Sequence, residues 1–372
     1  MNTKKILVVG DFISGSGLTR FIFNMFSNFN QNEYKIECVG YGIDQSKETD
    51  KKCEQLSWPL HRVIPITQNV VQHIKWWKSF FKKNDFDFIY FNYSSSWNYE
   101  PLKLARRYTK AKLICHSHNS YYSHTFNNKL LMMILNKINK RGKKFFNEYA
   151  DLKIATSKDA ALWMFGTLKN VTIVNNGIEL SKFEFDKVAR DMLRKQLGVF
   201  KDTKLIGFAG VLQERKNPIF ALEVFAKYLK TDSNSIMLII GKGPLEKEIK
   251  ERANALGISH RVKYIAYTNK INKWYSAMDI LLFPSLYEGF GLVPLEAQVS
   301  KLFVLASNNV APQVFSTKYI KKVKGFDKDK WNKVLNSIDF KMSNERNEID
   351  PALKKFDIKK QATIISNLLE GE

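Results

Sequence analysis

Two glutamates, Glu288 and Glu296, flank a glycine-rich corner in the stretch FPSLYEGFGLVPLEAQ (283–298). The corner follows an apolar run that predicts a buried strand, and Pro294 suits the first turn of a following helix, which would also hold Glu296. If the whole span were helical, the two carboxylates would lie about 12 Å apart. Glycines instead let the loop fold back, so that both acids and the amides of 291–293 face one ligand. Carboxylates that accept sugar hydroxyls, beside amides that accept phosphate, predict a nucleotide-sugar site. The alternative is a strand, a turn and a capped helix with solvated acids.

A histidine-rich stretch, HSHNS (116–120), ends another predicted strand. His116, His118 and His124 fall close together there, and α/β proteins place reacting groups at the carboxyl ends of parallel strands. A metal site is disfavoured, because the nearby thiol of Cys115 is expected on the opposite face of its strand. A polar or catalytic role and a purely structural role both stay open.

A glycine-rich turn, GDFISGSGLTRF (10–21), leads from the first predicted strand into a helix. Gly15 and Gly17 would let backbone amides approach an anion at the N-terminus of that helix. The full dinucleotide fingerprint is missing, so a plain tight turn is the alternative.

A basic loop, GVLQERKNP (210–218), follows the first predicted strand of the second half. Arg215 and Lys216 precede a helix that begins near Pro218, where their charge and the helix dipole would jointly hold phosphate. The alternative is a solvated basic loop.

The pair of aspartates in DFD (85–87) could hold a divalent metal against a diphosphate. The pair opens a predicted strand, however, and chemistry in parallel α/β sheets takes place at the other end of the strands. We therefore reject a metal site there.

The elements that position these residues alternate between short β-rich runs and longer periodic segments, which predicts parallel α/β domains. The predicted strands span 5–11, 34–42, 86–93, 111–118, 152–157, 171–177, 204–210, 235–243, 261–267, 279–285 and 302–307. Helices are expected at 218–230, at 244–256 with Gly257 as its C-terminal cap, and in the tail.

The predicted fold is two Rossmann-like domains with the active cleft between them. Residues 1–185 are expected to form the N-terminal domain, and 186–350 the C-terminal domain, which contains the predicted nucleotide-sugar site. Residues 351–372 form a final helix that packs back toward the N-terminal domain.

Composition limits the protein class. The chain of 372 residues is 44% apolar and 26% charged, which is ordinary for a globular protein. It contains no apolar run of about 18 residues, so no membrane-spanning segment is expected. Three cysteines without metal-ligand spacing fit a reducing cytosol.

The net charge of +23 is unevenly spread. Residues 101–150 contain one acid, Glu148, and many Lys and Arg, a field that attracts nucleic acid, anionic lipid or acidic small molecules. The segment HIKWWKSFFKKN (73–84) mixes aromatics with lysines, as an interfacial helix does. A surface helix that packs its aromatics on a sheet is the alternative. No nucleic-acid-binding motif is present, so nucleic acid is not an expected partner.

Several motifs in order along the chain resemble family 4 of the retaining glycosyltransferases, which have the GT-B fold. The motifs are SGSGLTRF, HSHNS, ATSKDAALWMFG, VTIVNNGIELSKF, GFAGVLQERKNP, IGKGPLEKEI and FPSLYEGFGLVPLEAQ. The similarity is greatest to bacterial enzymes of capsular and exopolysaccharide assembly.

The resemblance implies roles for individual residues. Glu288 would bind donor-sugar hydroxyls, Glu296 the ribose, and Lys216 the leaving diphosphate, while His118 would lie near the reacting carbon. His118, Glu288 and Lys216 would thus be catalytic. The implied donor-binding residues are Gly15, Gly17, His116, Asn176, Gly210, Arg215, Lys216, Gly241, Glu288, Gly289, Phe290, Gly291, Leu292 and Glu296. The resemblance also implies that residues 1–185 are the acceptor-binding, membrane-facing domain and 186–350 the donor-binding domain. It implies that no metal and no cofactor is needed.

One position departs from the family. Val211 follows Gly210 where the family usually has an arginine that shares the diphosphate charge. Losing one such donor costs about 3 kcal/mol at the transition state, or roughly a hundredfold in rate, unless Arg215 compensates.

The expected function is transfer of a hexose or N-acetylhexosamine from a nucleotide sugar, expected to be a UDP-sugar, to a lipid-linked glycan acceptor. The expected location is cytoplasmic, on an anionic membrane surface at the inner face of the plasma membrane. An inactive homologue that acts as a scaffold, a GT-B sugar-nucleotide epimerase and, last, a dinucleotide oxidoreductase are the alternatives. The sequence does not indicate the oligomeric state.

Overall fold

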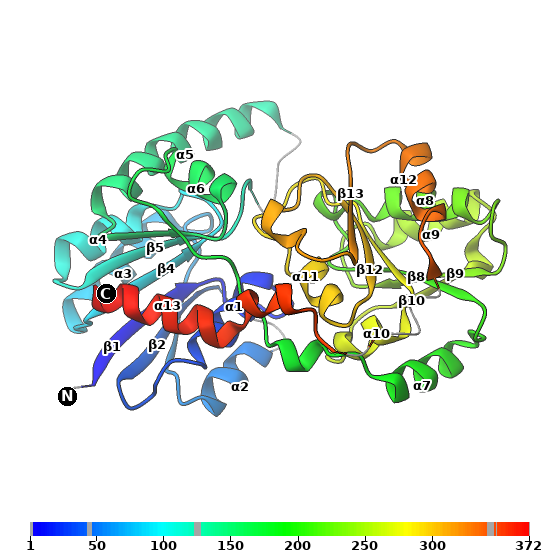
Figure 1. The fold of residues 1–372 in the computed structure, drawn as a ribbon. Coiled ribbons are helices and arrows are strands. Elements are labelled where there is room, and N and C mark those ends of the chain that lie inside the picture. The colour runs from blue at the N-terminus through cyan, green and yellow to red at the C-terminus, as the bar shows by residue number, and fades with distance from the viewer. Residues whose placement is uncertain (1–2, 43–46, 123–127, 341–345, 347, 372) are drawn as a thin grey trace. The chain divides into compact units, whose positions relative to one another are not determined.

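The computed structural model describes residues 3–42, 47–122, 128–340, 346 and 348–371. The chain forms two compact units, which are described separately: unit 1 is Met1–Gly177 with Ile358–Glu372, and unit 2 is Ile178–Asp357. The boundaries expected from the sequence are residues 185 and 350. In Figure 1 unit 1 contains the blue and cyan elements together with the red C-terminal helix.

Unit 1 has a parallel sheet whose described strands run in the order β3-β2-β1-β4-β5-β6-β7. Its strands are β1 (Lys4–Gly10), β2 (Tyr34–Tyr41), β3 (Leu60–Val63), β4 (Phe88–Tyr93), β5 (Lys112–Ser117), β6 (Leu152–Ala155) and β7 (Thr172–Ile173). Its helices are α1 (Gly17–Phe26), α2 (Glu48–Gln55), α3 (Val70–Lys83), α4 (Glu100–Tyr108), α5 (Lys129–Tyr149), α6 (Lys158–Phe165) and α13 (Ile358–Glu370). Apolar side chains of α1, α2 and α13 form the core on one face of the sheet, and those of α3, α4, α5 and α6 form the core on the other.

Unit 2 repeats this arrangement, with the order β10-β9-β8-β11-β12-β13 and parallel pairing throughout. Its strands are β8 (Lys204–Ala209), β9 (Ser235–Ile240), β10 (Val262–Ile265), β11 (Ile280–Phe283), β12 (Phe303–Ser307) and β13 (Ile320–Val323). Its α-helices are α7 (Lys187–Leu197), α8 (Pro218–Tyr228), α9 (Glu246–Ala255), α10 (Ile271–Ala277), α11 (Leu292–Val299) and α12 (Lys328–Asn336). Its 3₁₀ turns are Leu180–Phe183, Glu214–Lys216, Ser259–Arg261, Pro312–Val314 and Pro351–Phe356. The prediction of two Rossmann-like α/β domains is confirmed.

In each sheet the strand order reverses beside the first strand of the unit. This switch point lies between β1 and β4 in unit 1 and between β8 and β11 in unit 2. Loops that leave the carboxyl ends of these strands diverge to opposite faces of the sheet, so a ligand can bind between them. The switch points therefore define where each unit can place a site.

Helix α3 contains the aromatic and basic segment 73–84. Asn69 caps the helix by accepting a hydrogen bond from the Gln72 amide. Trp77, Phe80 and Phe81 are buried in the core against the sheet, and Trp76 packs against the same core. The structure thus favours the surface helix that packs its aromatics inward, because these rings are not available to a lipid surface.

Helix α13 packs on the face of the sheet that α1 also covers. Ile358, Ala362, Ile365 and Leu369 lie in the same core as the inner side of α1. At its end, Glu370 pairs with Lys4 and accepts a hydrogen bond from the Tyr34 hydroxyl at 2.7 Å. These contacts hold the end of α13 against β1 and β2.

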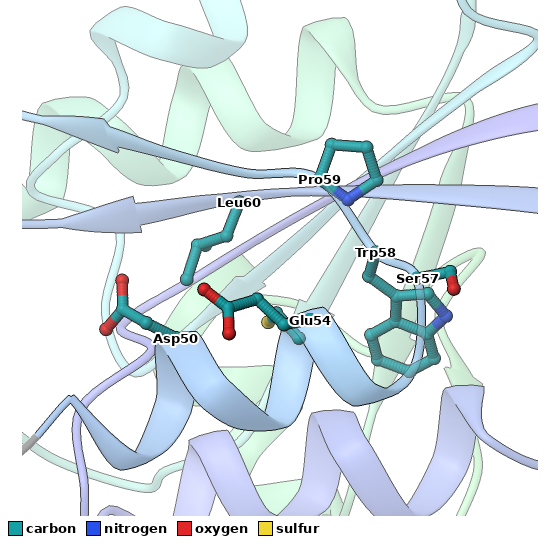
Figure 2. A pocket seen from close by; sticks show the side chains of 7 residues that line it. Asp50, Glu54, Ser57, Trp58, Pro59 and Leu60 are labelled. Carbon is teal, nitrogen blue, oxygen red and sulfur yellow. The ribbon is translucent and has the colours of Figure 1, made fainter.

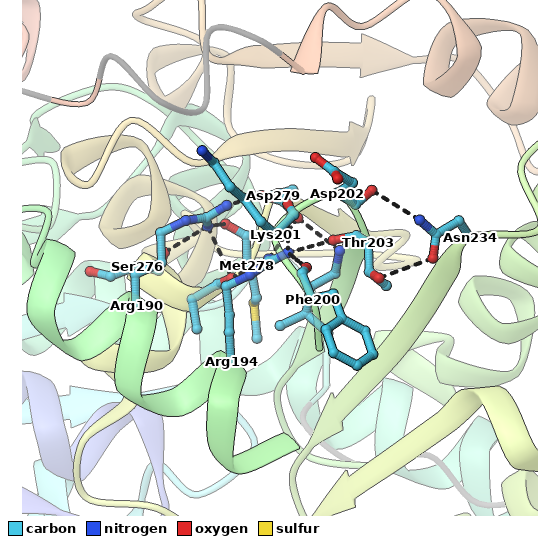
Figure 3. A network of polar contacts seen from close by, with 12 residues as sticks. Arg190, Arg194, Phe200, Lys201, Asp202, Thr203, Asn234, Ser276, Met278 and Asp279 are labelled. Carbon is cyan, nitrogen blue, oxygen red and sulfur yellow. Dashed lines mark hydrogen bonds and ion pairs between the residues drawn. The ribbon is translucent and has the colours of Figure 1, made fainter. Parts of the chain in front are cut away.

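A buried ionic network holds α7 against the amino ends of β8 and β11 (Figure 3). Asp279 accepts hydrogen bonds from Arg190 at 2.5 Å, from Arg194 at 2.9 Å and from the Leu205 amide at 2.8 Å. Arg194 also donates to the Thr203 carbonyl. The network fixes the amino ends of the two strands whose carboxyl ends form the switch point of unit 2.

Candidate functional site

The two loops at the switch point of unit 2 are joined by hydrogen bonds. The loop after β8 contains Arg215 and Lys216, and the loop after β11 contains Glu288. The Leu286 amide donates to the Arg215 carbonyl at 2.8 Å, and Arg215 Nη1 donates to the Tyr287 carbonyl at 3.3 Å. These bonds place the predicted cations, Arg215 and Lys216, beside the predicted carboxylate, Glu288.

Glu288 is the centre of this cluster. Lys216 Nζ forms an ion pair with Oε1, and Arg215 Nη1 lies 3.4 Å from Oε2. Burial alone would raise the pKa of Glu288, but the charges of Lys216 and Arg215 outweigh it and hold the pKa below its ordinary value. The carboxylate is therefore ionised near neutral pH, and the cluster of three has a net positive charge suited to phosphate.

Helix α11 begins beside this cluster, at Leu292, and Gly291 is its N-cap residue. The φ angle of Gly291 is +108°, and a Cβ there would lie 2.8 Å from Val310 Cγ1, so the position requires glycine. The N-cap residue Gly291 has no side chain to cap the first turn, so the amides of Leu292 and Val293 bear the positive end of the helix dipole. This is the chemistry that the sequence predicts for an anion-binding turn.

Glu296 is placed differently from Glu288. It is the fifth residue of α11, just past the first turn where the sequence placed it, whereas Pro294 does lie in that turn. Its side chain is only 1% exposed and accepts a hydrogen bond from the Tyr275 hydroxyl at 3.1 Å. Its role as a ribose ligand stays a prediction.

Gly210 and Gly241 bring the loops after β8 and β9 into contact. Their φ angles are +149° and +151°, and a Cβ on Gly241 would lie 1.9 Å from the Gly210 carbonyl oxygen. The Leu212 amide donates to the Lys242 carbonyl at 2.9 Å across the same contact. Packing is thus sufficient to explain Gly241, one of the predicted donor-binding residues.

The corner before α11 also contains Gly289 and Phe290. The Phe290 ring is buried and lies 5.8 Å from the ring of Phe356, and its carbonyl accepts from the Ala311 amide at 3.2 Å. These contacts fix the backbone of the corner, so Phe290 positions the turn through its packing.

In unit 1, the loop after β1 contains Gly15 and Gly17 at the start of α1. Ser16 caps the helix, and a Cβ on either glycine would meet nothing within 4 Å. Asp11, which the sequence reading missed, accepts from Ser16 Oγ at 2.5 Å and from Thr19 Oγ1 at 2.6 Å. Burial raises the pKa of Asp11, and the two hydroxyls oppose that rise. Open space therefore surrounds the two glycines, and the Asp11 carboxylate holds the start of α1 through Ser16 and Thr19.

His116 and His118 lie side by side at the carboxyl end of β5, with ring centroids 4.1 Å apart. Burial lowers the pKa of His118 to about 3, and burial together with His118 lowers the pKa of His116. Both rings are therefore neutral at physiological pH. His124 lies outside the described residues.

Neighbouring side chains on β4 fix both imidazoles. Asn92 Nδ2 donates to the Val9 carbonyl at 3.3 Å, so Oδ1 is the atom that faces His118 Nε2 at 3.0 Å. His118 must then carry its proton on Nε2, which leaves Nδ1 as an acceptor. The Tyr90 hydroxyl lies 2.9 Å from His116 Nδ1. Sequence reasoning missed Asn92 and Tyr90, although strand alternation places both on the face that contains His116.

Asn176 and Gly177 end unit 1 at the point where α13 returns. Asn176 is buried, and within the described part of the chain its Oδ1 has no hydrogen-bond partner. The Gly177 amide donates to Gln361 Oε1 at 2.8 Å, and a Cβ there would lie 2.7 Å from Ile358 Cα. Close packing against α13 therefore requires glycine at this corner.

The rejected metal pair lies where the sequence placed it, before β4. Asp87 Oδ2 accepts a hydrogen bond from the Lys5 amide at 2.7 Å, so this carboxylate binds backbone at the amino end of β1. Cys115 packs in the core on the face opposite His116, as expected. Among the described residues, no group of three or more His, Cys, Asp or Glu side chains is arranged to hold a metal ion.

A hollow of about 420 Å³ lies between α2 and the turn into β3 (Figure 2). It is lined by Asp50, Cys53, Glu54, Ser57, Trp58, Pro59 and Leu60. None of these is a predicted site residue, and the two acids disfavour a phosphate ligand. We therefore do not assign the donor to this hollow.

Within the described ranges, no helix has both the length and the apolar character needed to cross a membrane.

Two protein-family models match the chain and together cover most of it. The model described as "Glycosyltransferase Family 4" matches residues 15–182, and that described as "Glycosyl transferases group 1" matches 189–351. The boundary between the two matches lies near the boundary between the two units.

Individual proteins are similar over differing lengths. EpsF of Bacillus subtilis, which is named as a glycosyltransferase, is 24% identical across 84% of this chain and 81% of its own. The UDP-Gal:alpha-D-GlcNAc-diphosphoundecaprenol alpha-1,3-galactosyltransferase of Escherichia coli is 30% identical, but across only 37% of this chain and 36% of its own. The crystal structure of Anabaena Alr3699/HepE in complex with UDP-glucose superposes with a TM-score of 0.79 at 18% identity, covering 99% of this chain and 100% of that one.

Proposed function

We propose a donor, an acceptor and a stereochemical course for a chain that belongs to glycosyltransferase family 4 and has the GT-B fold. In the proposal it transfers a hexose or N-acetylhexosamine from a UDP-sugar to a lipid-linked glycan, with retention, in cell-surface polysaccharide biosynthesis. The observation that carries the proposal is the Lys216–Glu288–Arg215 cluster at the switch point of unit 2.

The donor assignment rests on charge. A nucleoside diphosphate needs cations and backbone amides, and a sugar needs a fixed carboxylate to accept its hydroxyls. Lys216 and Arg215 supply the cations, and the first residues of α11 supply the amides. Glu288 supplies the carboxylate for the sugar. The UDP-glucose complex of the similar Anabaena protein supports UDP as the nucleotide.

The acceptor assignment has a different basis. The Escherichia coli relative is named for an acceptor on diphosphoundecaprenol, which is a lipid-linked sugar. Such an acceptor is held at a membrane, so the proposal places this chain in the cytoplasm, peripheral to the inner face of the plasma membrane. The excess of Lys and Arg in 101–150 fits an anionic membrane surface as a partner.

Departure of the nucleoside diphosphate builds negative charge on the leaving oxygens, which Lys216, Arg215 and the α11 amides stabilise. These groups supply the positive charge, so the proposal needs no metal ion or cofactor. The acceptor hydroxyl approaches the face that the leaving group vacates, which gives retention. His118 is neutral and therefore contributes hydrogen bonding rather than a cationic charge.

Arg215 is central to the proposal because Val211 replaces the arginine usual in the family. Val211 is 41% exposed, whereas Arg215 is directed to Glu288 from the same loop. We propose that Arg215 takes over the missing charge. An inactive homologue that serves as a scaffold is the competing function, and Val211 is the observation that favours it.

Thermal stabilisation of the purified chain by a panel of nucleotide sugars tests this proposal, because ligand binding raises the melting temperature by mass action. We expect UDP-sugars to stabilise the protein and Arg215→Met to weaken that effect. A wild-type chain that no nucleotide sugar stabilises would favour the scaffold. Analysis of products formed without acceptor separates the transferase from a sugar-nucleotide epimerase.

A further inference from the structure

Helix α5 has one face fixed against the body of unit 1. Asn139 Oδ1 accepts from the Ser96 amide at 2.9 Å, and a Cβ on Gly142 would lie 1.7 Å from the Ser96 carbonyl oxygen. Phe146 follows on the same side and is fully buried. Because residues three and four apart share a face, these three residues determine which side of α5 points outward.

The outward side of α5 is apolar over its first turns. The side chains there are between 39% and 63% exposed, in a helix that is otherwise rich in lysine. They are Leu130, Leu131, Met133, Ile134 and Ile138. Single exposed apolar side chains are ordinary, but five on one helix face form a patch, and patches mark interaction sites.

Basic side chains surround and follow this patch. They are Lys129, Lys137, Lys140, Arg141 and Lys144, all exposed. In the part of the chain that the structure describes, none of them pairs with an acid. We name the five apolar and five basic side chains together the α5 face.

We propose that the α5 face binds an anionic lipid surface, with the apolar side chains at the acyl boundary and the lysines and arginine at the headgroups. This combination of an apolar patch and unpaired cations is what interfacial helices use, and the charge complements acidic lipid. The proposal rests on the proposed transfer to a lipid-linked acceptor and names the surface that would hold the enzyme beside it.

Helix α3, which the sequence pattern suggested as the interfacial helix, fits a lipid surface less well than α5. Trp77, Phe80 and Phe81 of α3 are in the core, and the large apolar side chains that α3 exposes are Val70 and Val71 in its first turn, against five on α5. On α5 the apolar and basic side chains are outward together. Both α3 and α5 belong to unit 1 and are labelled in Figure 1.

Co-sedimentation of the full chain with phosphatidylglycerol-containing vesicles tests the proposal. We expect binding at low salt that weakens at high salt, and loss of about tenfold or more in the triple variant Leu130→Ser, Met133→Ser, Ile134→Ser. Lys137→Glu with Arg141→Glu should give a similar loss. Vesicles of phosphatidylcholine alone should bind weakly.

Matched controls make the same changes elsewhere. Val188→Ser with Met192→Ser removes apolar side chains that are 78% and 60% exposed on α7, and Lys75→Glu with Lys83→Glu reverses two charges on α3. Both should keep vesicle binding. Full binding by the α5 variants, or an equal loss in the controls, would overturn the proposal.

Two further measurements separate the causes of failure. Circular dichroism and UDP-sugar binding should be unchanged in the α5 variants, which shows that they fold and that the donor site is intact. Sedimentation velocity tests whether the α5 face instead binds a second copy of the chain. If the wild type does not bind vesicles but forms a dimer that only the α5 variants dissociate, the lipid assignment is overturned. Vesicle binding through α5 by a chain that transfers no sugar would instead refute the proposed function.

Discussion

Glu288, in the loop after β11, is held by two cations, and at the scale of single residues its replacement should have the largest effect on activity. We expect Glu288→Ala to lower kcat/KM by about a hundredfold or more, because it removes the sugar ligand and leaves Lys216 without its carboxylate. Glu214→Ala, an exposed acid in the loop of Lys216, is the matched control and should change activity by about twofold at most. Equal activity of the two variants would remove Glu288 from the site.

The pH dependence of this pair follows from the direction of its pKa shift. The pKa of Glu288 is lowered below 4.5, so the stability that the pair contributes is present above that value. It is lost as pH falls through the lower, folded-state pKa. Donor binding measured by calorimetry should therefore be insensitive to Glu288 titration at neutral pH.

Asn92 fixes the imidazole of His118, and its replacement should be visible in a titration. In Asn92→Asp a carboxylate faces His118 Nε2, so the pKa of His118 should rise from about 3 toward its ordinary 6.5. In the wild type, His118 of the unfolded chain is protonated below about pH 6.5, whereas in the folded chain it stays neutral down to about pH 3. The stability of the fold therefore falls as the pH is lowered from about 6.5 to about 3. NMR titration of the histidine Cε1 protons measures the shift. An unchanged pKa in Asn92→Asp would contradict the assigned contact.

Two of the predicted donor-binding glycines should respond oppositely to alanine. Gly17 has open space around it, so Gly17→Ala should preserve the melting temperature while weakening UDP binding. Gly241 has a φ of +151° and a Cβ site occupied by the Gly210 carbonyl, so Gly241→Ala should cost about 1–3 kcal/mol of unfolding free energy. Urea denaturation and calorimetry separate the two effects. Unchanged UDP binding by Gly17→Ala would remove Gly17 from the donor site.

At the scale of elements, the buried network of α7 determines how the strands of unit 2 are held. Burial alone would raise the pKa of Asp279, but Arg190, Arg194 and the Leu205 amide outweigh it and lower the pKa. Asp279→Ala should cost about 3 kcal/mol or more of unfolding free energy, because it leaves the buried Arg194 and the half-buried Arg190 without their carboxylate. Glu251→Ala, which removes the exposed partner of Lys247, should leave urea unfolding unchanged. A comparable response of both variants would contradict the structural role of the network.

Some elements could be predicted from the sequence and others could not, for physical reasons. Buried strands such as β8 and β11 are continuous apolar runs, which the sequence makes visible. Strands β3 (LHRV) and β13 (IKKV) lie at the edges of their sheets and have few buried side chains, so no apolar run marks them. The sequence did not predict which side of α5 points outward. That side is set by contacts of Asn139 and Gly142 with Ser96, which is distant in sequence.

At the scale of the whole molecule, unit 2 repeats the strand order of unit 1 apart from the additional strand β7, and the predicted residues Lys216 and Glu288 follow the two strands at its switch point. Glu288 and Lys216 could each be predicted because each follows the carboxyl end of a predicted strand. The structure adds that these two strands are neighbours in one sheet. Asp11 and Asn92 could not be predicted, because an isolated polar residue in a loop or strand gives no signal until its partners are known. The predicted site between the two units stays a prediction.

The most direct test of the central claim is transfer by the purified chain from a UDP-sugar to a sugar-diphospho-lipid acceptor in vesicles, with the product analysed by mass spectrometry and NMR. We expect an acceptor extended by one sugar with the anomeric configuration of the donor. We also expect Lys216→Met to slow the reaction by about a hundredfold, whereas Lys242→Met, which changes a lysine in the loop after β9, should retain it. An inverted product, or transfer at an equal rate by Lys216→Met, would contradict the proposed function.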